Sequence, residues 1–303
     1  MMTWIVPVDI GLVMGLLLAW AVVAFTLAFR LLDFPDLTVE GSLPLGAAVF
    51  AVLHKSGIPM PVSILAAVCG GGLAGAVTGF LYVRFNLNKF LAGIIVIAMS
   101  YSLSLRVMGA SNIGLLQATS FFDIVEPIDK AVPGRLHPGT IGLLGLMLAL
   151  GGTGVLWALS TRRGIGMRVA GSNPEYARSL GISVPLNVVA GLAITNGLAA
   201  FAGVLLTMHQ GFADIGMGQG VLILALAAMT IGERLLPEKD LPFHVFVFLA
   251  AIVGSVVYQV LIAYAVRAGL APTDLKLATA VLVLAVVALR VSRNGELLAE
   301  VHQ

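Results

Sequence analysis

The chain has 303 residues, of which 59% are hydrophobic and 11% are charged, and its mean hydropathy is +1.03. This apolar share lies well beyond that of an ordinary soluble domain, so the composition predicts a membrane protein with no separate soluble domain. A formal net charge of only +2 argues against nucleic acid as a partner.

Apolar runs recur along the whole chain, and several are long enough to cross a bilayer as helices, which takes roughly 17–25 residues. The first run lacks a basic start and a small-residue cleavage site, so we expect a retained span. The expected spans are 11–32, 43–53, 60–83, 90–108, 139–159, 187–208, 217–232, 241–266 and 275–291. The predicted fold is therefore an all-α polytopic membrane protein with about 8–10 transmembrane helices in a single domain, 1–303.

Basic residues divide unevenly between the two faces of the membrane when the sides alternate along these spans. One face receives Arg30, Arg84, Lys89, Arg162, Arg163, Arg168, Arg178, Arg234, Lys239, Arg290 and Arg293, and the other receives Lys55, Arg106, Lys130, Arg135, Arg267 and Lys276. The positive-inside rule makes the first face cytoplasmic and places the N-terminus outside and the C-terminus inside. The 43–53 segment is short enough to be re-entrant, which leaves the N-terminal orientation open.

An internal repeat relates two parts of the chain. Residues 36–42 resemble residues 214–220, and each segment precedes a short apolar run, a long span and a polar break, at 86–89 and 272–274. The two copies begin an odd number of spans apart, so they have opposite orientations. Inverted repeats with broken half-helices indicate a transporter core.

Glu40 is the most informative ionisable residue, because a charge at membrane depth is costly and usually faces a cavity or a partner. Unwound backbone at that depth is tolerated only within protein or beside water. We therefore predict that both breaks line a translocation pathway through Asp36, Glu40, Ser42, Asp214 and Gln219. The alternative, which is compatible with it, is that Glu40 and Ser42 cap a half-helix.

Two spans carry small residues at a four-residue spacing, which lets helices approach closely in lipid, and we expect these positions to serve in helix packing. The positions are Gly71, Gly75, Gly79, Gly191, Thr195, Ala199 and Gly203. The lone Cys69 excludes an internal disulfide framework, and we expect it to be a small buried core residue. The histidines have no ligand spacing, so no metal site is expected.

The polar stretch 161–182 is too polar to lie in lipid. Asn173 is a good N-cap, Pro174 suits the first helical position and Glu175 complements the helix dipole. With Gly181 as the stop, these residues predict a helix of roughly two turns, about 10 Å long, outside the membrane. So short a helix needs a surface to dock against. The alternative is a basic loop held near anionic lipid.

Residues 166–182 resemble the cytoplasmic coupling loop of ABC transporter permeases of the branched-chain amino acid and ribose type. Agreement continues, in family order, at 36–42, 91–94 and 231–234. The resemblance implies a coupling loop over 161–186 whose residues 173–181 dock on a cytoplasmic ATPase and transmit its closure to the membrane core. The coupling residues expected are Gly171, Asn173, Pro174, Glu175, Ala177, Arg178, Leu180 and Gly181.

The resemblance further implies a permease subunit of an ATP-driven importer for an amino acid or similar small organic solute, in the plasma membrane of a bacterium. The chain itself is then no enzyme and binds no cofactor, since ATP is hydrolysed on a separate partner. The expected partners are cytoplasmic ATPase subunits, an extracytoplasmic solute-binding protein, a second copy of the permease and membrane lipid. An ion-coupled secondary transporter and a non-transporting scaffold are the alternatives.

Overall fold

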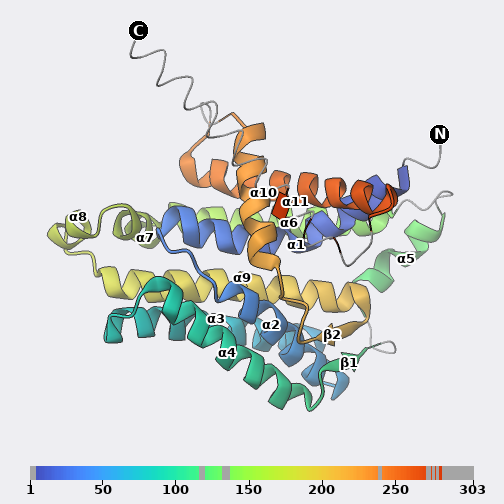
Figure 1. Cartoon of the computed structure of the whole chain (residues 1–303), viewed down its shortest axis with the longest axis horizontal. Coiled ribbons are helices and arrows are strands. Elements are labelled where there is room, and N and C mark those ends of the chain that lie inside the picture. The colour runs from blue at the N-terminus through green and yellow to red at the C-terminus, as the bar shows by residue number, and fades with distance from the viewer. Residues whose placement is uncertain are drawn as a thin grey trace, which may run out of the picture.

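The computed structural model describes residues 5–115, 120–131, 137–237 and 241–270, and the single residues 274, 277, 280 and 281. Within this part of the chain nearly all regular structure is helical, which confirms the predicted all-α fold (Figure 1). The helices are α1 (Ile5–Leu31), α2 (Val39–Lys55), α3 (Met60–Phe85), α4 (Lys89–Met108), α5 (Phe122–Ala131), α6 (Pro138–Ser160), α7 (Arg162–Ser172), α8 (Pro174–Ser179), α9 (Val184–Gln210), α10 (Val221–Leu235) and α11 (Phe243–Arg267). Two short antiparallel strands, β1 (Asn112–Gly114) and β2 (Phe212–Asp214), pair with each other.

Among the described residues, six helices are long and apolar enough to cross a membrane, namely α1, α3, α4, α6, α9 and α11. Two shorter helices, α2 with 17 residues and α10 with 15, correspond to the two short apolar segments expected from the sequence. The last expected span, 275–291, lies outside the described residues apart from isolated positions. The chain is thus a multi-pass membrane protein.

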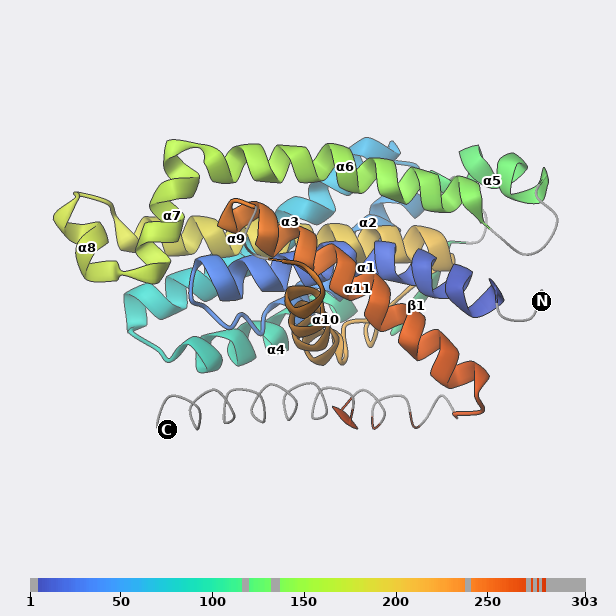
Figure 2. The same cartoon turned by 90° about the horizontal axis from the view of Figure 1, so that it is seen from above.

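The helices exchange partners between the two halves of the chain. Helices α1 and α9 lie side by side at the centre and run in opposite directions (Figure 2). Helix α1 packs against α11, whereas α9 packs against α3, so that the first long helix of each half pairs with the third helix of the other. This exchange is the arrangement that the predicted inverted repeat requires.

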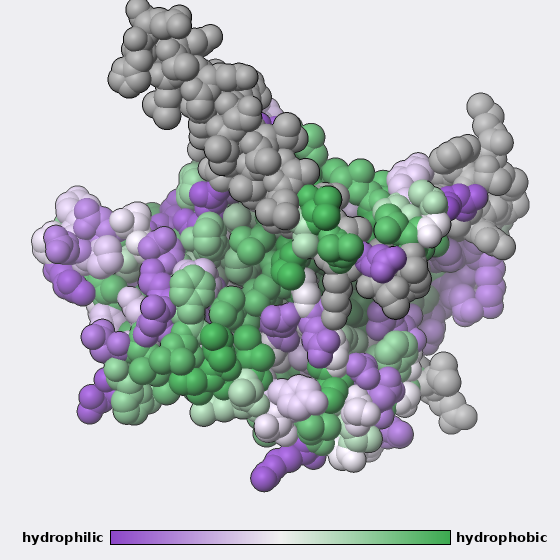
Figure 3. Space-filling model, in the orientation of Figure 1, coloured by the Kyte–Doolittle hydropathy of each residue, from purple (hydrophilic) through white to green (hydrophobic). Residues whose placement is uncertain are grey.

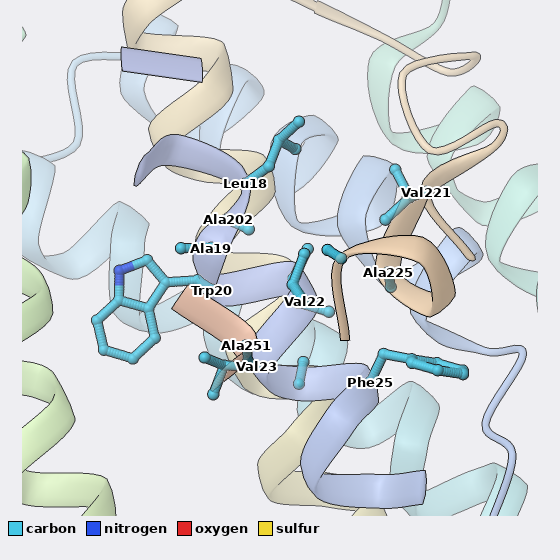
Figure 4. Packing of buried hydrophobic residues seen from close by; sticks show 14 of the residues in the cluster. Leu18, Ala19, Trp20, Val22, Val23, Phe25, Ala202, Val221, Ala225 and Ala251 are labelled. Carbon is cyan, nitrogen blue, oxygen red and sulfur yellow. The ribbon is translucent and has the colours of Figure 1, made fainter. Parts of the chain in front are cut away.

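Helix α1 is apolar around its whole circumference, and such a helix belongs in the core of the molecule. Figure 4 shows Trp20, Val22 and Phe25 of α1 beside side chains from α9, α10 and α11. These side chains are almost completely buried. Because α1 is central, a shift of its C-terminal end would displace the helices packed around it.

The predicted small-residue positions pack closely, those of α3 against α9 and Gly203 of α9 against the carbonyl oxygen of Leu43 in α2. A Cβ atom added to Gly75 would lie 2.1 Å from the carbonyl oxygen of Leu192, far inside van der Waals contact. The expectation for Cys69 is wrong, because its side chain is exposed. Helix α3 turns its small residues toward α9, and Cys69 lies outside this contact.

Polar surface gathers at the two ends of the long helices. Figure 3 shows a hydrophobic band with hydrophilic residues around α7 and α8 at one end and around α5 at the other. Helix α1 begins at the end opposite to α7 and α8 (Figure 2), as the predicted orientation requires. The positive-inside rule predicts that the α7–α8 end is cytoplasmic, and under this prediction it is called the cytoplasmic end.

Candidate functional site

The break before α2 is shorter than the sequence suggested. The Asp36 carboxylate accepts a hydrogen bond from the backbone N–H of Thr38 at 2.9 Å, and helix α2 begins at the next residue, Val39. Glu40 and Ser42, expected in unwound chain, therefore lie in the first turns of a helix. The turn made by the Asp36 side chain starts the helix earlier than the apolar run alone indicates.

A buried polar network fastens this break to α9. Asn196 donates from Nδ2 to Asp36 Oδ2 and to the carbonyl oxygen of Leu192, while its Oδ1 accepts from Ser42 Oγ at 2.7 Å. The side chains of Asp36, Ser42 and Asn196 are all fully buried. Two of the five predicted pathway residues thus sit in a closed network between helices.

Sequence reasoning missed Asn196, the residue at the centre of this network. The available signal was an amide side chain directly beside Thr195 in the small-residue face of a predicted span. A second missed contact joins Thr38 Oγ1 and Thr78 Oγ1, 2.7 Å apart, and ties the same break to α3. Because both contacts are fully buried between helices, they fix the start of α2 against two neighbouring helices.

Glu40 lies where the starts of the two short helices meet. Its Oε1 accepts a hydrogen bond from the backbone N–H of Gly220, the residue that precedes α10. A Cβ atom on Gly218 would lie only 2.1 Å from the carbonyl oxygen of Glu40, so the two segments are in direct backbone contact. The N-termini of α2 and α10 both carry partial positive charge. The Glu40 carboxylate offsets the charge at both.

A cavity of about 610 Å³ opens beside Glu40 and Gln219. Its walls come from α1, α2, α9, α10 and α11, and they are mainly apolar, with Gln210 and Gln259 as further polar groups. This volume is in the range of sites for small organic molecules, roughly 300–1,000 Å³. The structure therefore brings two of the predicted pathway residues, one from each half of the repeat, to one cavity.

Asp214 lies away from that cavity, at the end of β2. Its Oδ1 accepts from the backbone N–H of Gly216 at 2.7 Å, and its Oδ2 accepts from Asn112 Nδ2 at 3.4 Å. Asn112 and Asp214 are also register partners in the β1–β2 pair. Asp214 thus orders the turn that leads into α10 and links it to the segment that follows α4.

At the cytoplasmic end, the first half of the polar stretch forms a helix that the sequence did not predict. Helix α7 follows the N-cap Thr161, whose Oγ1 accepts from the backbone N–H of Gly164 at 3.3 Å. Its three glycines made the segment look turn-rich, since glycine disfavours a helix interior. Close neighbours require two of them: a Cβ on Gly171 would lie 2.2 Å from the carbonyl oxygen of Leu31, at the end of α1, and a Cβ on Gly164 would lie 2.5 Å from the carbonyl oxygen of Ala158 in α6.

The second half of the stretch confirms the predicted short helix. Asn173 accepts from the backbone N–H of Tyr176 at 2.9 Å and Pro174 is the first residue of α8. Gly181 has φ +74°, and Ile182 N–H bonds the carbonyl oxygen of Ala177 at 2.9 Å, which ends the helix. Left-handed backbone after the last turn is the conformation that favours glycine.

One of the expected coupling residues of α8 does not lie on its exposed surface. Ala177 is fully buried, so its side chain packs inward, whereas Tyr176 and Leu180 are more than half exposed. Glu175 and Arg178 are exposed beside them. Sequence reasoning missed Tyr176, although its four-residue spacing from Leu180 places both on one face of the helix.

An ion pair links the cytoplasmic ends of α1 and α10. Arg30 binds both carboxylate oxygens of Glu233, with 2.6 Å between Nε and Oε1, and both side chains are partly buried. Contacts therefore run from α8 through α7 to the end of α1, and from there to α10, whose other end borders the cavity. Within the described residues no cluster of potential metal ligands is present.

Comparison with known proteins identifies a family whose pattern matches most of the chain. Residues 8–289 match the family described as branched-chain amino acid transport system / permease component. A tyrosine transport system permease protein of Clostridioides difficile (strain R20291) is 34% identical over 301 residues, covering 95% of each chain. The autoinducer 2 import system permease protein LsrC of Enterobacter sp. (strain 638) is 30% identical, over 65% of this chain and 55% of the relative.

One solved structure also overlays on the chain. It is PsaBC from Streptococcus pneumoniae in complex with Fab, which covers 91% of this chain and 89% of its own, at 14% identity and a TM-score of 0.49.

Proposed function

The chain belongs to the family of permease components of branched-chain amino acid transport systems, and from this membership we propose how its parts act. As a member it is the membrane-embedded permease subunit of an ATP-driven importer for a small organic solute. Hydrolysis of ATP belongs, in this proposal, to a separate cytoplasmic ATPase. The observation that carries the proposal is the capped helix α8, which presents an apolar and charged surface at the cytoplasmic end.

Helix α8 is proposed as the docking element for the ATPase. Tyr176 and Leu180 provide apolar contact area, and Glu175 and Arg178 provide charges that fix orientation. Asn173, Pro174 and Gly181 define the two ends of the helix, while Gly171 and Ala177 hold it against the permease. An aromatic residue at the centre of a small contact surface is a common source of binding energy.

Movement of α8 is proposed to reach the membrane core through α7 and α1. The close contact between Gly171 and Leu31 leaves no room for α7 to slide independently of α1. The Arg30–Glu233 ion pair then couples α1 to α10. Since α10 begins at the cavity beside Glu40, ATPase closure alters the cavity walls.

The cavity beside Glu40 and Gln219 is proposed as part of the solute pathway. Among the five residues first considered for the pathway, these two face solute, Asp36 and Ser42 hold the break in place, and Asp214 orders the outer turn. A carboxylate and amide groups on mainly apolar walls suit an amino acid, whose ammonium and carboxylate need polar partners. The tyrosine system named for the relative makes an aromatic amino acid the first solute to test.

The complete importer is proposed to contain two copies of this permease, two ATPase subunits and an extracytoplasmic solute-binding protein. The external segment around α5 is a candidate contact for the binding protein, because Ile124 and Ile128 are exposed on it. Its acidic residues are engaged locally: Asp129 accepts from the backbone N–H of Gly139 at 2.6 Å, and Glu126 pairs with Lys130. The apolar side chains are therefore the stronger candidates.

Reconstitution of the permease in liposomes tests the proposal. With its ATPase and binding protein present, uptake of labelled tyrosine should require ATP and should stop when any one partner is omitted. Uptake by the permease alone, driven by an ion gradient, would instead support the ion-coupled alternative. Absence of flux for a panel of amino acids with all partners present would support the scaffold alternative.

A further inference from the structure

A second and larger hollow lies on the opposite side of α1 from the Glu40 cavity, at the cytoplasmic end. It is a groove of about 920 Å³ between α1, α6, α7 and α9. Leu27 and Leu31 of α1, Val155 of α6 and Ile194 of α9 form apolar walls, and polar groups occur mainly where the groove reaches α7. The groove therefore has a long apolar part and one polar end.

Two arginines stand at the polar end. Arg162 and Arg163 line the groove and occupy the first turn of α7, which contains no acidic residue. Both are exposed, and no ion pair or hydrogen bond engages their guanidinium groups within the described part of the chain. Cations at the positive end of a helix are unfavourable, so a bound anion here stabilises the local structure.

The depth of the groove matches the position of a lipid. Trp157 lies three residues before the end of α6, lines the groove and is 74% exposed. Tryptophan is enriched at the level of the lipid headgroups. The apolar part thus extends from the headgroup level into the membrane core, and the arginines lie at the cytoplasmic surface, where anionic lipids concentrate.

We propose that this groove binds an anionic phospholipid of the cytoplasmic leaflet. The acyl chains lie between α6, α1 and α9, and the phosphate contacts Arg162 and Arg163. Basic pockets between membrane helices on the cytoplasmic side have this combination of apolar walls and paired cations. The site does not depend on which solute is carried, and it places a lipid in contact with the same α7 that leads to α8.

Fluorescence of Trp157 provides a direct probe. The full chain is reconstituted in phosphatidylcholine bilayers containing phosphatidylglycerol, and the bromine quencher is placed on the acyl chains of either lipid at equal mole fraction. Trp157→Phe supplies the signal to subtract, because the chain has 3 tryptophans. We expect phosphatidylglycerol to associate about thirtyfold more strongly than phosphatidylcholine, since each of the two arginines near the surface attracts anionic lipid by roughly 1 kcal/mol.

Matched variants separate the site from general contact with lipid. Arg162→Gln with Arg163→Gln should abolish the preference, whereas Arg84→Gln, at an exposed arginine on the cytoplasmic end of α3, should retain it. Gly154→Leu should reduce quenching, because a Cβ at Gly154 meets open space inside the groove. Gly145→Leu is the control on the same helix, with open space but outside the groove lining.

Two results would overturn the proposal. Equal quenching by both brominated lipids means that Trp157 meets only ordinary surrounding lipid. Protection of Trp157 from both lipids means that protein, such as a second copy of the chain, covers the groove. Thermal unfolding of each variant in detergent shows whether it is folded. If the double arginine variant does not fold, the Gly154→Leu measurement still decides the test.

Discussion

Gly171 of α7 and Leu31 of α1 are in backbone contact, and an added Cβ on Gly171 would lie 2.2 Å from the carbonyl oxygen of Leu31. The coupling segment therefore rests on the end of the central helix of the molecule. Leu31 follows Arg30, whose ion pair reaches α10. Helix α7 also contacts α6 and α9, but the Gly171–Leu31 contact is the one that joins it to α1 and, through Arg30, to α10.

Gly171→Val is expected to uncouple transport while leaving the permease folded. The valine side chain forces α7 away from α1, and overpacking of this kind costs about 1–3 kcal/mol. Solute uptake per ATP hydrolysed should fall about tenfold, within the range of typical coupling energies. The measurement is the ratio of uptake to ATP hydrolysis in proteoliposomes.

Gly145→Val provides the control for that change, because a Cβ at Gly145 meets no atom within 4 Å. It adds the same side chain to α6, the helix that precedes α7, without displacing backbone. An unchanged coupling ratio in Gly171→Val would show that the α7–α1 contact does not carry the motion.

Removal of the exposed apolar side chains of α8 is expected to weaken ATPase binding. Tyr176→Ala with Leu180→Ala should raise the dissociation constant by about tenfold or more, because central aromatic contacts commonly contribute over 1 kcal/mol. Reversal of charge at Glu175 and Arg178 should impair assembly in the same assay. Co-purification and titration of the ATPase against reconstituted permease measure both effects.

Ser172→Ala is the matched control for the α8 variants, since Ser172 is exposed on the neighbouring helix and makes only a local bond to the Val169 carbonyl oxygen. Undisturbed ATPase assembly with both α8 variants would contradict the docking role.

The sequence was sufficient to predict features that depend on local chemistry. Asn173, Pro174 and Gly181 define α8 through capping and backbone preference, which act within a few residues. The long spans followed from apolar length, and the close helix packing at Gly71, Gly75 and Gly79 followed from the spacing of small residues.

Features that depend on contacts between distant segments were not predictable in this way. Helix α7 contains glycines that are unfavourable for an isolated helix, of which Gly171 becomes necessary only against α1 and Gly164 only against the end of α6. Ala177 was expected among the coupling residues, but its burial depends on the packing of α8 within the fold. The partner of Asp36 and Ser42 is Asn196, more than 150 residues away, as the separation of 154 from Ser42 shows.

Asn196→Leu is expected to destabilise the permease strongly. It leaves Asp36 and Ser42 buried without their shared partner, and each unsatisfied buried group costs about 1–3 kcal/mol, more if charged. A double-mutant cycle with Ser42→Ala should show coupling of at least about 0.5 kcal/mol, because the residues share one network. Thermal or denaturant unfolding in detergent gives these values.

The same helix offers a control for that loss. Thr207 is also fully buried in α9, and its Oγ1 has no hydrogen-bond partner among the described residues. Thr207→Val should therefore be neutral or stabilising. Equal losses from Asn196→Leu and Thr207→Val would indicate that the Asn196 network contributes nothing beyond packing.

Glu40 is expected to act through its charge as well as through its hydrogen bond to Gly220. Glu40→Gln keeps an oxygen acceptor for the Gly220 N–H but removes the negative charge that faces both the cavity and the starts of α2 and α10. Uptake of a zwitterionic amino acid should fall severalfold or more, since a charge-assisted contact is worth about 1.5–3 kcal/mol. Glu40→Ala removes both contributions and should also lower the unfolding temperature.

Gln210→Ala is the comparison for Glu40, because it alters a neutral polar group in the same cavity wall. Its effect on uptake should be smaller, and the unfolding temperature should not change. If Glu40→Gln transports at the normal rate while Glu40→Ala is unstable, the carboxylate serves only to join the two short helices. The solute pathway would then lie elsewhere in the permease. The proposal that the cavity beside Gln219 belongs to this pathway would be wrong, although the family assignment stands.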